Sequence, residues 1–133
     1  MVKEWKRLAY HEGAYGYWIP AYPQTIAAGK SVSFAHTYYG LIKFLLVETR
    51  GIKVAAGSAG RSLKLRIWFD DDNVDVYIPA KDPEGEYAAC VNFGRKYLLG
   101  EHTLKLENLG DVTISNVEFA AYHAYEEIAE EVS

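Results

Sequence analysis

The chain has 133 residues, of which 50% are hydrophobic and 24% are charged, and its formal net charge is -4. This length suits one domain with a core of its own, and the composition excludes a disordered or low-complexity chain. The acidic balance and the lack of any lysine or arginine block argue against nucleic-acid binding. Sugars, other proteins or neutral small molecules are the expected partners.

The N-terminal segment MVKEWKRLAYHEG lacks the apolar core and the small-residue cleavage site of a signal peptide. The longest apolar run, FLLV at 44–47, is too short to cross a bilayer. We therefore expect neither a membrane anchor nor export by the usual route, which leaves a virion or an extracellular assembly open, because a phage component leaves the cell by lysis. The single methionine and single cysteine hint at a thermophilic source.

The segment AYGYWIPAYP at 14–23 is the most aromatic part of the chain. Pro20 and Pro23 make it a poor central strand, so a loop or an edge segment is predicted. Its rings cannot all point inward from such a backbone, and we expect them to bind a ligand, to cap the domain or to contact a neighbouring subunit. The aromatic rings of this segment belong to Tyr15, Tyr17, Trp18 and Tyr22.

Two alternating runs in the middle of the chain predict a β-hairpin. SLKLRIWF at 62–69 and NVDVYI at 73–78 each place apolar residues at every second position, as a strand with one buried face does. The aspartates between them supply turn residues. Pairing Phe69 with Val74 would bring the apolar residues of both runs to the same face.

Similar short runs occur along the rest of the chain and are separated by turn residues. They are KSVSFAHTYY, LIKFLLVE, GIKVAA, YAACVNF, HTLKLE and DVTISNVEF. Many short strands with almost no helical period predict an all-β fold, an antiparallel sandwich or barrel. In the last run the inward residues change phase at Ser115 and Asn116, which predicts a β-bulge.

The C-terminal segment AYHAYEEIAEEVS has a different period. Its apolar residues recur every three or four positions between glutamates, which predicts a short amphipathic helix or arm. It either packs on its own domain or docks on a neighbouring subunit, since three helical turns are marginal alone in water. We accordingly divide the chain into a β-sandwich domain at 1–122 and an extension at 123–133.

Three stretches resemble the galactose-binding-like β-jelly rolls found as carbohydrate-binding modules and as accessory domains of carbohydrate esterases. They are SFAHTYYGLIKF, SLKLRIWFDDDNVDVYIPA and LLGEHTLKLENLGDVTISNVEF. The most specific part is GEHTLKLENLGDVTISNVEF, with a glycine-led turn before EHTLKL and a closing strand that ends in an apolar-Glu-Phe triplet. The resemblance implies a jelly roll that binds sugars, peptides or lipids, or that serves only as architecture.

Motifs for catalysis or metal binding are few. There is no Gly-x-Ser-x-Gly elbow, and the histidines at 11, 36, 102 and 123 lack metal-ligand spacing, so we expect no enzyme and no cofactor. His102, in the GEHT turn, is expected to be structural. The aspartates at 70–72 could gather a calcium ion, although a solvated hairpin turn is the favoured interpretation. Cys90 lies among apolar residues and is expected to be buried and inert.

The outward face of the predicted hairpin is the candidate binding site. Sugar recognition needs aromatic rings against the pyranose and polar groups for its hydroxyls, and the predicted register puts Trp68 opposite Asp75 and Arg66 opposite Tyr77. The alternative is that this face packs under the N-terminal segment. The candidate ligand-binding residues are Trp68, Tyr77, Arg66, Asp75, Tyr17, Trp18 and Tyr22.

Two functions fit these observations. One is a non-catalytic module that binds carbohydrate or adheres to a glycan surface. The other is a self-associating structural subunit of a larger assembly, such as a virion decoration, a tail or fibre protein, or an extracellular filament.

Overall fold

The computed structural model of the protein describes residues 4–18, 23–54, 61–80 and 85–132, and within them it contains strands and turns but no helix. The strands are β1 (Glu4–Trp18), β2 (Gln24–Ile26), β3 (Ser31–Val54), β4 (Arg61–Phe69), β5 (Asp72–Ala80), β6 (Tyr87–Asn92), β7 (Lys96–Asn108) and β8 (Ile114–Val132). Every strand pair is antiparallel. The predicted all-β antiparallel fold is therefore confirmed.

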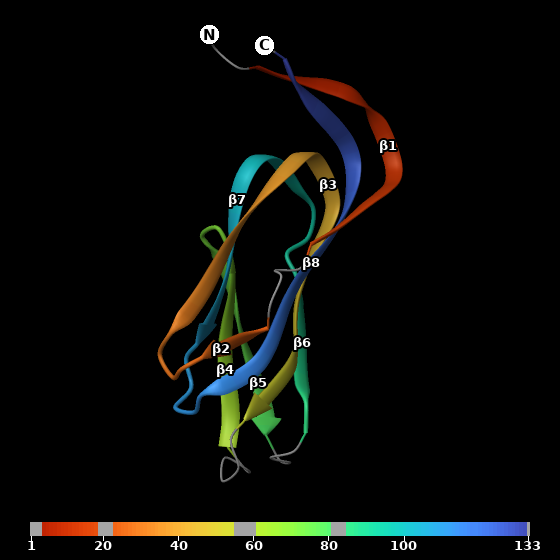
Figure 1. Cartoon of the computed structure of the whole chain (residues 1–133). Coiled ribbons are helices and arrows are strands. Elements are labelled where there is room, and N and C mark those ends of the chain that lie inside the picture. Colours follow the sequence, from red (N-terminus) through yellow and green to blue (C-terminus); the bar gives the residue numbers. More distant parts are fainter. Residues whose placement is uncertain (1–3, 19–22, 55–60, 81–84, 133) are drawn as a thin grey trace.

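The strands form two layers because β3 contributes to both (Figure 1). Its first part pairs with β7, which continues to β4 and β5 and forms one layer. Its second part lies between β6 and β8 in the other layer, and β2 adds to the edge of β8. The three runs predicted as separate strands at 30–56 are thus one strand, since neither Gly40 nor Gly51 ends it.

Glycines allow the long strands to bend from one layer toward the other. Gly40 has φ 151° and lies so close to β8 that a Cβ there would overlap the carbonyl oxygen of Glu127. Gly100 of β7, which pairs with Tyr38, has φ 92°. Both values are rare for residues with a side chain, so glycine permits this turn of the chain.

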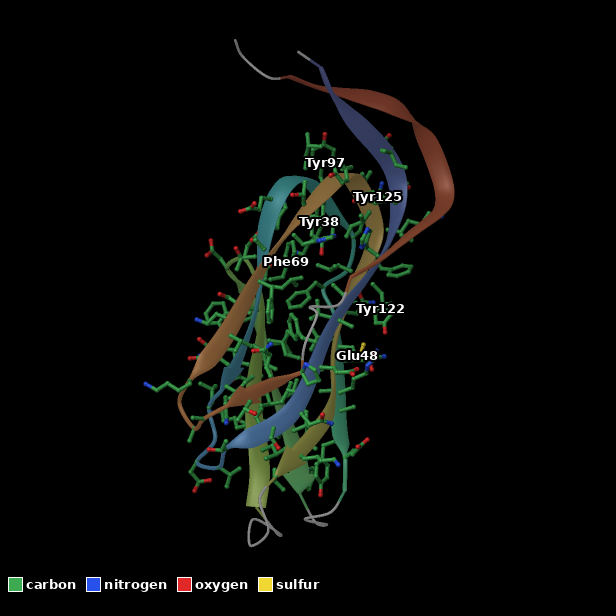
Figure 2. All side chains as sticks on the ribbon, viewed as in Figure 1. Tyr38, Glu48, Phe69, Tyr97, Tyr122 and Tyr125 are labelled. Carbon is green, nitrogen blue, oxygen red and sulfur yellow. The ribbon has the colours of Figure 1, made fainter. Side chains whose placement is uncertain are left out.

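The core lies between the layers and is built from the inward residues of the alternating strands (Figure 2). Its largest fully buried side chains include Tyr38, Phe119, Ile26, Ile42, Leu45, Ile52, Leu65, Ile67, Leu104 and Leu106. The alternation that predicted the strands is therefore also the pattern that fills the core.

Asn108 holds the turn between β7 and β8 in place. It is 1% exposed, and its amide nitrogen donates to the carbonyls of Ile26 at 3.1 Å and Val112 at 2.8 Å. Its side-chain oxygen accepts from the backbone of Gly110 at 3.0 Å. These bonds satisfy a buried amide and connect β2 to the start of β8.

The predicted bulge at Ser115 and Asn116 is confirmed. Asn116 has φ 56°, and the pairing of β2 with β8 shifts register across this site. Val112 and Ile114 before the bulge and Val117 after it are all buried. The extra residue restores the inward direction of the apolar side chains.

The β4–β5 hairpin forms, but the predicted register is wrong by two residues. Phe69 pairs with Asp72 instead of Val74, because the turn needs only Asp70 and Asp71. Asp70 has φ 49°, a conformation that aspartate tolerates better than most residues. A shift of two positions keeps every side chain on its predicted face, because the side-chain period of a strand is two.

The predicted C-terminal helix is wrong, because the segment from 121 to 132 continues β8. Hydrogen bonding to β1 on one side and β3 on the other outweighs a weak helical pattern. Glu126 is an extra residue opposite β3, between the pairs Ile42–Tyr125 and Leu41–Glu127. Because of this extra residue, Tyr125 and Ile128 lie three positions apart in the sequence, a spacing that resembles the period of a helix. The division of the chain after residue 122 stays a prediction.

The aromatic segment at 14–23 is partly described. Its first residues end β1, which lies at the edge of the sheet and pairs with β8, so the predicted edge position is confirmed. Residues 19–22 lie outside the described part. With β8, β1 forms a two-stranded ribbon that extends beyond the sandwich (Figure 1). None of the described residues forms a helix long and apolar enough to span a membrane.

Candidate functional site

The predicted site residues of β4 and β5 lie together on the outward face of one layer. The inward residues of β4 are buried, whereas Arg66 and Trp68 are partly exposed on the other side. In the observed register Arg66 pairs with Asp75, and Tyr77 pairs with Lys64. Neither Trp68 nor Tyr77 is in the core, so the structure brings the four predicted residues onto one surface.

Arg66 and Asp75 form a bidentate ion pair across the hairpin. Arg66 Nε donates to Asp75 Oδ1 at 2.6 Å, and the terminal guanidinium nitrogen donates to Oδ2 at 3.1 Å. The hydrogen bond from Arg66 lowers the pKa of Asp75, and the same bond raises the pKa of Arg66. The pair is charged at neutral pH and holds both groups in a fixed geometry.

Trp68 lies among charged side chains from β7 and from its own strand, β4. Its indole nitrogen donates to Glu107 Oε1 at 3.1 Å. The Lys105 ammonium lies 5.2 Å from the ring centroid, and the Arg66 guanidinium lies 6.0 Å from it. Cation–π contacts of this kind hold a ring in place while leaving part of it accessible.

Tyr77 is the most accessible aromatic residue of this face. It is 63% exposed, and the Lys64 ammonium lies 5.5 Å from its ring centroid. We call the surface formed by Arg66, Trp68, Asp75 and Tyr77, together with Lys64, Lys105 and Glu107, the outer face. It combines two rings with donors and acceptors of both charges.

The remaining predicted site residues, Tyr17, Trp18 and Tyr22, cannot be added to this surface. Tyr22 lies outside the described residues, and only the backbone of Tyr17 and Trp18 is described, in pairs with Tyr122 and Ala121 of β8. Their role in binding stays a prediction.

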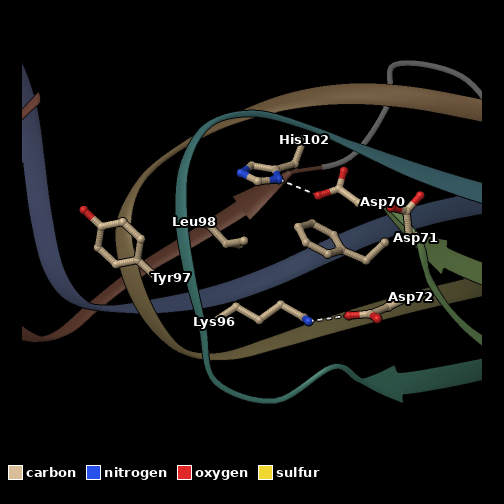
Figure 3. A pocket seen from close by; sticks show the side chains of 8 residues that line it. Asp70, Asp71, Asp72, Lys96, Tyr97, Leu98 and His102 are labelled. Atoms are coloured by element: carbon tan, nitrogen blue, oxygen red, sulfur yellow. Dashed lines mark hydrogen bonds and ion pairs between the residues drawn. The ribbon is translucent and has the colours of Figure 1, made fainter. Parts of the chain in front are cut away.

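His102 forms part of a small polar site at the β4–β5 turn (Figure 3). Its Nδ1 lies 2.6 Å from Asp70 Oδ2, and the backbone of Thr103 donates to Asp70 Oδ1 at 2.9 Å. Lys96 donates to Asp72 at 2.6 Å. Two of the three turn aspartates that we considered as calcium ligands, Asp70 and Asp72, thus bind β7. No group of three described acidic, histidine or cysteine residues is placed to hold a metal ion.

Three histidines that are far apart in sequence meet around Tyr38 between the layers. The ring centroid of Tyr38 lies 4.9 Å from that of His36, 5.0 Å from that of His123 and 6.0 Å from that of His102. Burial lowers the pKa of His123 to about 4, with a further contribution from His36. His123 is therefore neutral at physiological pH.

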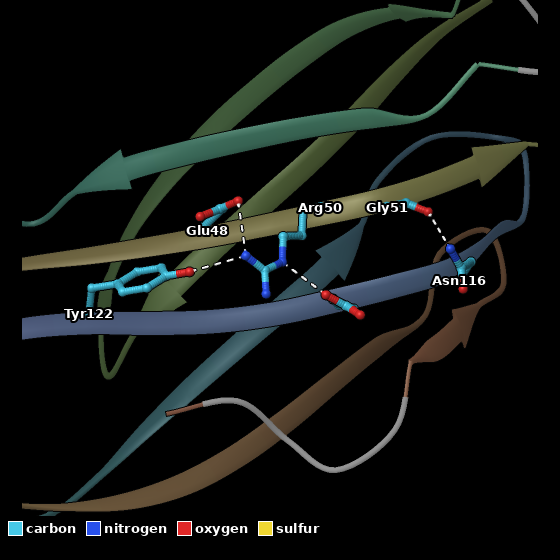
Figure 4. A network of polar contacts seen from close by, with 6 residues as sticks. Glu48, Arg50, Gly51, Asn116 and Tyr122 are labelled. Atoms are coloured by element: carbon cyan, nitrogen blue, oxygen red, sulfur yellow. Dashed lines mark hydrogen bonds and ion pairs between the residues drawn. The ribbon is translucent and has the colours of Figure 1, made fainter. Parts of the chain in front are cut away.

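A second polar network lies on the outward face of the other layer, centred on Arg50 (Figure 4). Arg50 Nε donates to Glu118 at 2.9 Å and Nη1 donates to the Tyr122 hydroxyl at 3.2 Å, while Glu48 lies 3.9 Å away. These bonds join β3 to β8. Their donors and acceptors satisfy one another, which favours a structural role.

Cys90 corrects another expectation, since it is exposed and not buried. In β6 the inward residue is Val91, which places Cys90 on the opposite side of the strand, paired with Glu48. Partial burial and the Glu48 carboxylate raise the pKa of the thiol. The cysteine is therefore predominantly protonated at neutral pH.

Sequence reasoning missed the residues of β7 that complete the outer face. The alternation in HTLKLE does place Lys105 and Glu107 on the outward side. Only the pairing of β7 with β4, which sets Trp68 opposite Lys105 and Arg66 opposite Glu107, brings them to the site. A pattern within one strand does not identify the neighbouring strand.

No protein-family model matches the chain, and no curated protein matches it by sequence. Among solved structures, it is similar to the CBM36-1 domain of a multidomain xylanase from the hindgut metagenome of Trinervitermes trinervoides, with a TM-score of 0.46 and 8% identity over 91% of this chain and 96% of that one. It is also similar to part of a ruminal GH26 endo-beta-1,4-mannanase, with a TM-score of 0.43 and 15% identity over 80% of this chain.

A third similar structure is the exo-beta-1,3-galactanase of Phanerochaete chrysosporium, with a TM-score of 0.45 and 9% identity over 94% of this chain. The chain spans 19% of the mannanase and 30% of the galactanase. The function of this chain is therefore inferred from its own residues.

Proposed function

We propose that the protein is a non-catalytic β-sandwich module that binds carbohydrate through its outer face. The observation that carries the proposal is the position of Trp68 and Tyr77 on one surface, with Tyr77 63% exposed and Trp68 oriented by Glu107. A pyranose presents an apolar face that packs against such rings and a rim of hydroxyls that bind charged groups. The outer face offers both kinds of contact side by side.

The resemblance to galactose-binding-like jelly rolls supports the same proposal. Its most specific stretch, GEHTLKLENLGDVTISNVEF, forms the end of β7, the turn held by Asn108 and the first part of β8 with its bulge. Membership of that superfamily is part of the proposal. The outer face would bind one side of an extended polysaccharide, whose successive sugars offer the same contacts along the length of the polysaccharide.

Trp68→Ala is expected to remove most of the binding to polysaccharide. Losing an aromatic platform costs about 1 to 2 kcal/mol, which weakens binding by about 5-fold to 30-fold. Affinity gel electrophoresis with soluble mannan, xylan and galactan measures the retardation. Tyr77→Ala is a second variant in which an exposed ring is removed without disturbing the core.

Tyr97→Ala is the matched control, because Tyr97 is 65% exposed but lies at the bend of β7 and away from the outer face (Figure 2). It should bind like the parent protein. A parent that no polysaccharide retards, or Trp68→Ala and Tyr77→Ala variants that bind as tightly as Tyr97→Ala, would disprove the proposal.

The alternative function, a structural subunit, is favoured by the ribbon of β1 and β8. The ribbon extends beyond the two layers (Figure 1), and two strands by themselves are marginally stable in water. An edge strand such as β1 also leaves backbone groups that another chain can pair with. Association with a neighbouring subunit would stabilise the ribbon and satisfy this edge.

If the structural role is correct, the 133-residue chain should form dimers or larger species whose proportion increases with concentration. Sedimentation velocity over micromolar concentrations measures this distribution, and added polysaccharide serves as the control that separates self-association from binding to a glycan. A protein that stays monomeric throughout the range would contradict the structural role and leave the carbohydrate-binding proposal intact.

A further inference from the structure

A groove of about 480 Å³ opens between β3, β7 and β8, on the side of the molecule where β3 bends. Its lining includes His36, Tyr39, Glu101, His123 and Tyr125. The volume lies within the range of about 300 to 1,000 Å³ that is typical of small-molecule sites. None of these residues belongs to the outer face.

The groove follows an edge of β3 that pairs with none of the described strands. Among the described residues, Ser31–Tyr39 of β3 pairs only with β7. The backbone nitrogen of Tyr39 donates to the Tyr125 hydroxyl at 3.0 Å, so a side chain of β8 replaces the missing strand at this position. This contact fixes Tyr125 in the groove wall and leaves the 46% exposed Tyr39 at its rim.

His123 gives the groove a buried polar group without a partner. The residue is 4% exposed, and its Nδ1 has no hydrogen-bond partner within the described part of the chain. Buried nitrogens of this kind are almost always hydrogen-bonded in proteins, to protein, water or ligand. A neutral imidazole offers one donor and one acceptor, which suits a hydroxyl group because a hydroxyl does both.

The charge of the lining restricts the ligand further. Among the described residues that line the groove, Glu101 carries a charge and none is a lysine or an arginine. An anionic ligand would meet a carboxylate with no compensating cation. A neutral ligand with several hydroxyls would donate to Glu101, bind His123 and pack against the Tyr39 ring.

We propose that this groove is a second ligand site, which takes a neutral polyhydroxylated ligand such as a monosaccharide or the end of a sugar chain. It differs from the outer face in its position, between β3, β7 and β8, and in its lining of histidine, tyrosine and glutamate side chains. The site does not depend on the outer face, and either one binds ligand without the other.

The test is an NMR titration of the 133-residue chain with galactose, with xylose and with glycerol, followed through the ring resonances of His123 and His36. We expect saturable shifts with at least one sugar, and weaker or no saturation with glycerol, which lacks a ring face for Tyr39. Tyr39→Ala should weaken the sugar affinity about tenfold, as expected for a lost aromatic contact. His123→Phe keeps a ring of similar shape and should abolish the shifts seen at His36.

Trp68→Ala and Tyr97→Ala are the controls and should leave the titration unchanged, which separates the groove from the outer face. Ring resonances that move with none of the three probes would overturn the proposal. So would a Tyr39→Ala variant with unchanged affinity, because Tyr39 lies at the surface and its replacement leaves the core intact. If polysaccharide gels retard the parent protein but the titration shows no sugar-dependent shift, the proposed groove site is wrong and the proposed binding by the outer face is unaffected.

Discussion

Gly40→Ala is expected to destabilise the protein by about 3 kcal/mol, the upper end of the usual cost of overpacking. The added Cβ would overlap the backbone carbonyl oxygen of Glu127 in β8, and backbone cannot move aside as a flexible side chain does. The residue also has φ 151°, which favours glycine. Urea denaturation followed by tryptophan fluorescence measures the change in the free energy of unfolding.

Gly100→Ala is the control for this prediction. Gly100 has φ 92° but no heavy atom within 4 Å of an added Cβ, so it carries the backbone strain without the overlap. Its replacement should cost about 1 to 2 kcal/mol. If Gly40→Ala lowers the free energy of unfolding by no more than Gly100→Ala does, then β3 does not approach β8 as closely at this bend as the structure shows.

The second large effect is a loss of stability in acid that originates in His123. Its pKa falls from 6.5 in the unfolded chain to about 4 in the folded protein, through burial and the nearby His36. Above about pH 6.5 the ring is neutral in both states and contributes nothing. Between about pH 6.5 and 4 the unfolded state binds the proton more readily, so the stability falls with pH by up to about 3 kcal/mol.

Urea denaturation at about pH 7 and about pH 4.5 measures this slope. Burial also lowers the pKa of His36, which adds an effect of the same sign. Among the described residues, the aromatic groups that face His123 are His36, Tyr38 and Tyr125, whose ring centroids lie 6.2, 5.0 and 4.8 Å away. The His123→Phe variant keeps the ring but cannot be protonated, so its stability should fall less in acid. Equal slopes in the two proteins would contradict the role of His123.

The hairpin shows how far local pattern predicts this fold. The face of each residue in β4 and β5 follows from the alternation of Leu63, Leu65 and Ile67. The predicted faces are correct although the predicted register is wrong by two positions. The pairs themselves depend on the turn, and the tolerance of Asp70 for a positive φ shortened that turn to two residues. Arg66 consequently binds Asp75 and not the predicted Tyr77.

The C-terminal segment shows where local pattern misleads. The spacing of three between Tyr122, Tyr125 and Ile128 indicated a helix, whereas pairing with β1 and β3 makes the segment a strand. The backbone of β8 gains hydrogen bonds from two partners, and a helix of three turns would gain none of them. Pairing with strands so far away in the sequence produces no pattern within the segment from which it could be predicted.

The sequence by itself determined the β class, the inward residues of most strands, the bulge before Val117 and the outward position of Trp68 and Tyr77. Each of these depends on residues within a few positions of one another. The tertiary structure alone decided which strands are neighbours, and with that the contacts of Trp68 with Lys105 and Glu107 and the meeting of His36, His102 and His123 around Tyr38. Such groups form by strand pairing and by the folding of β3 over the core, which bring together residues that share no local pattern.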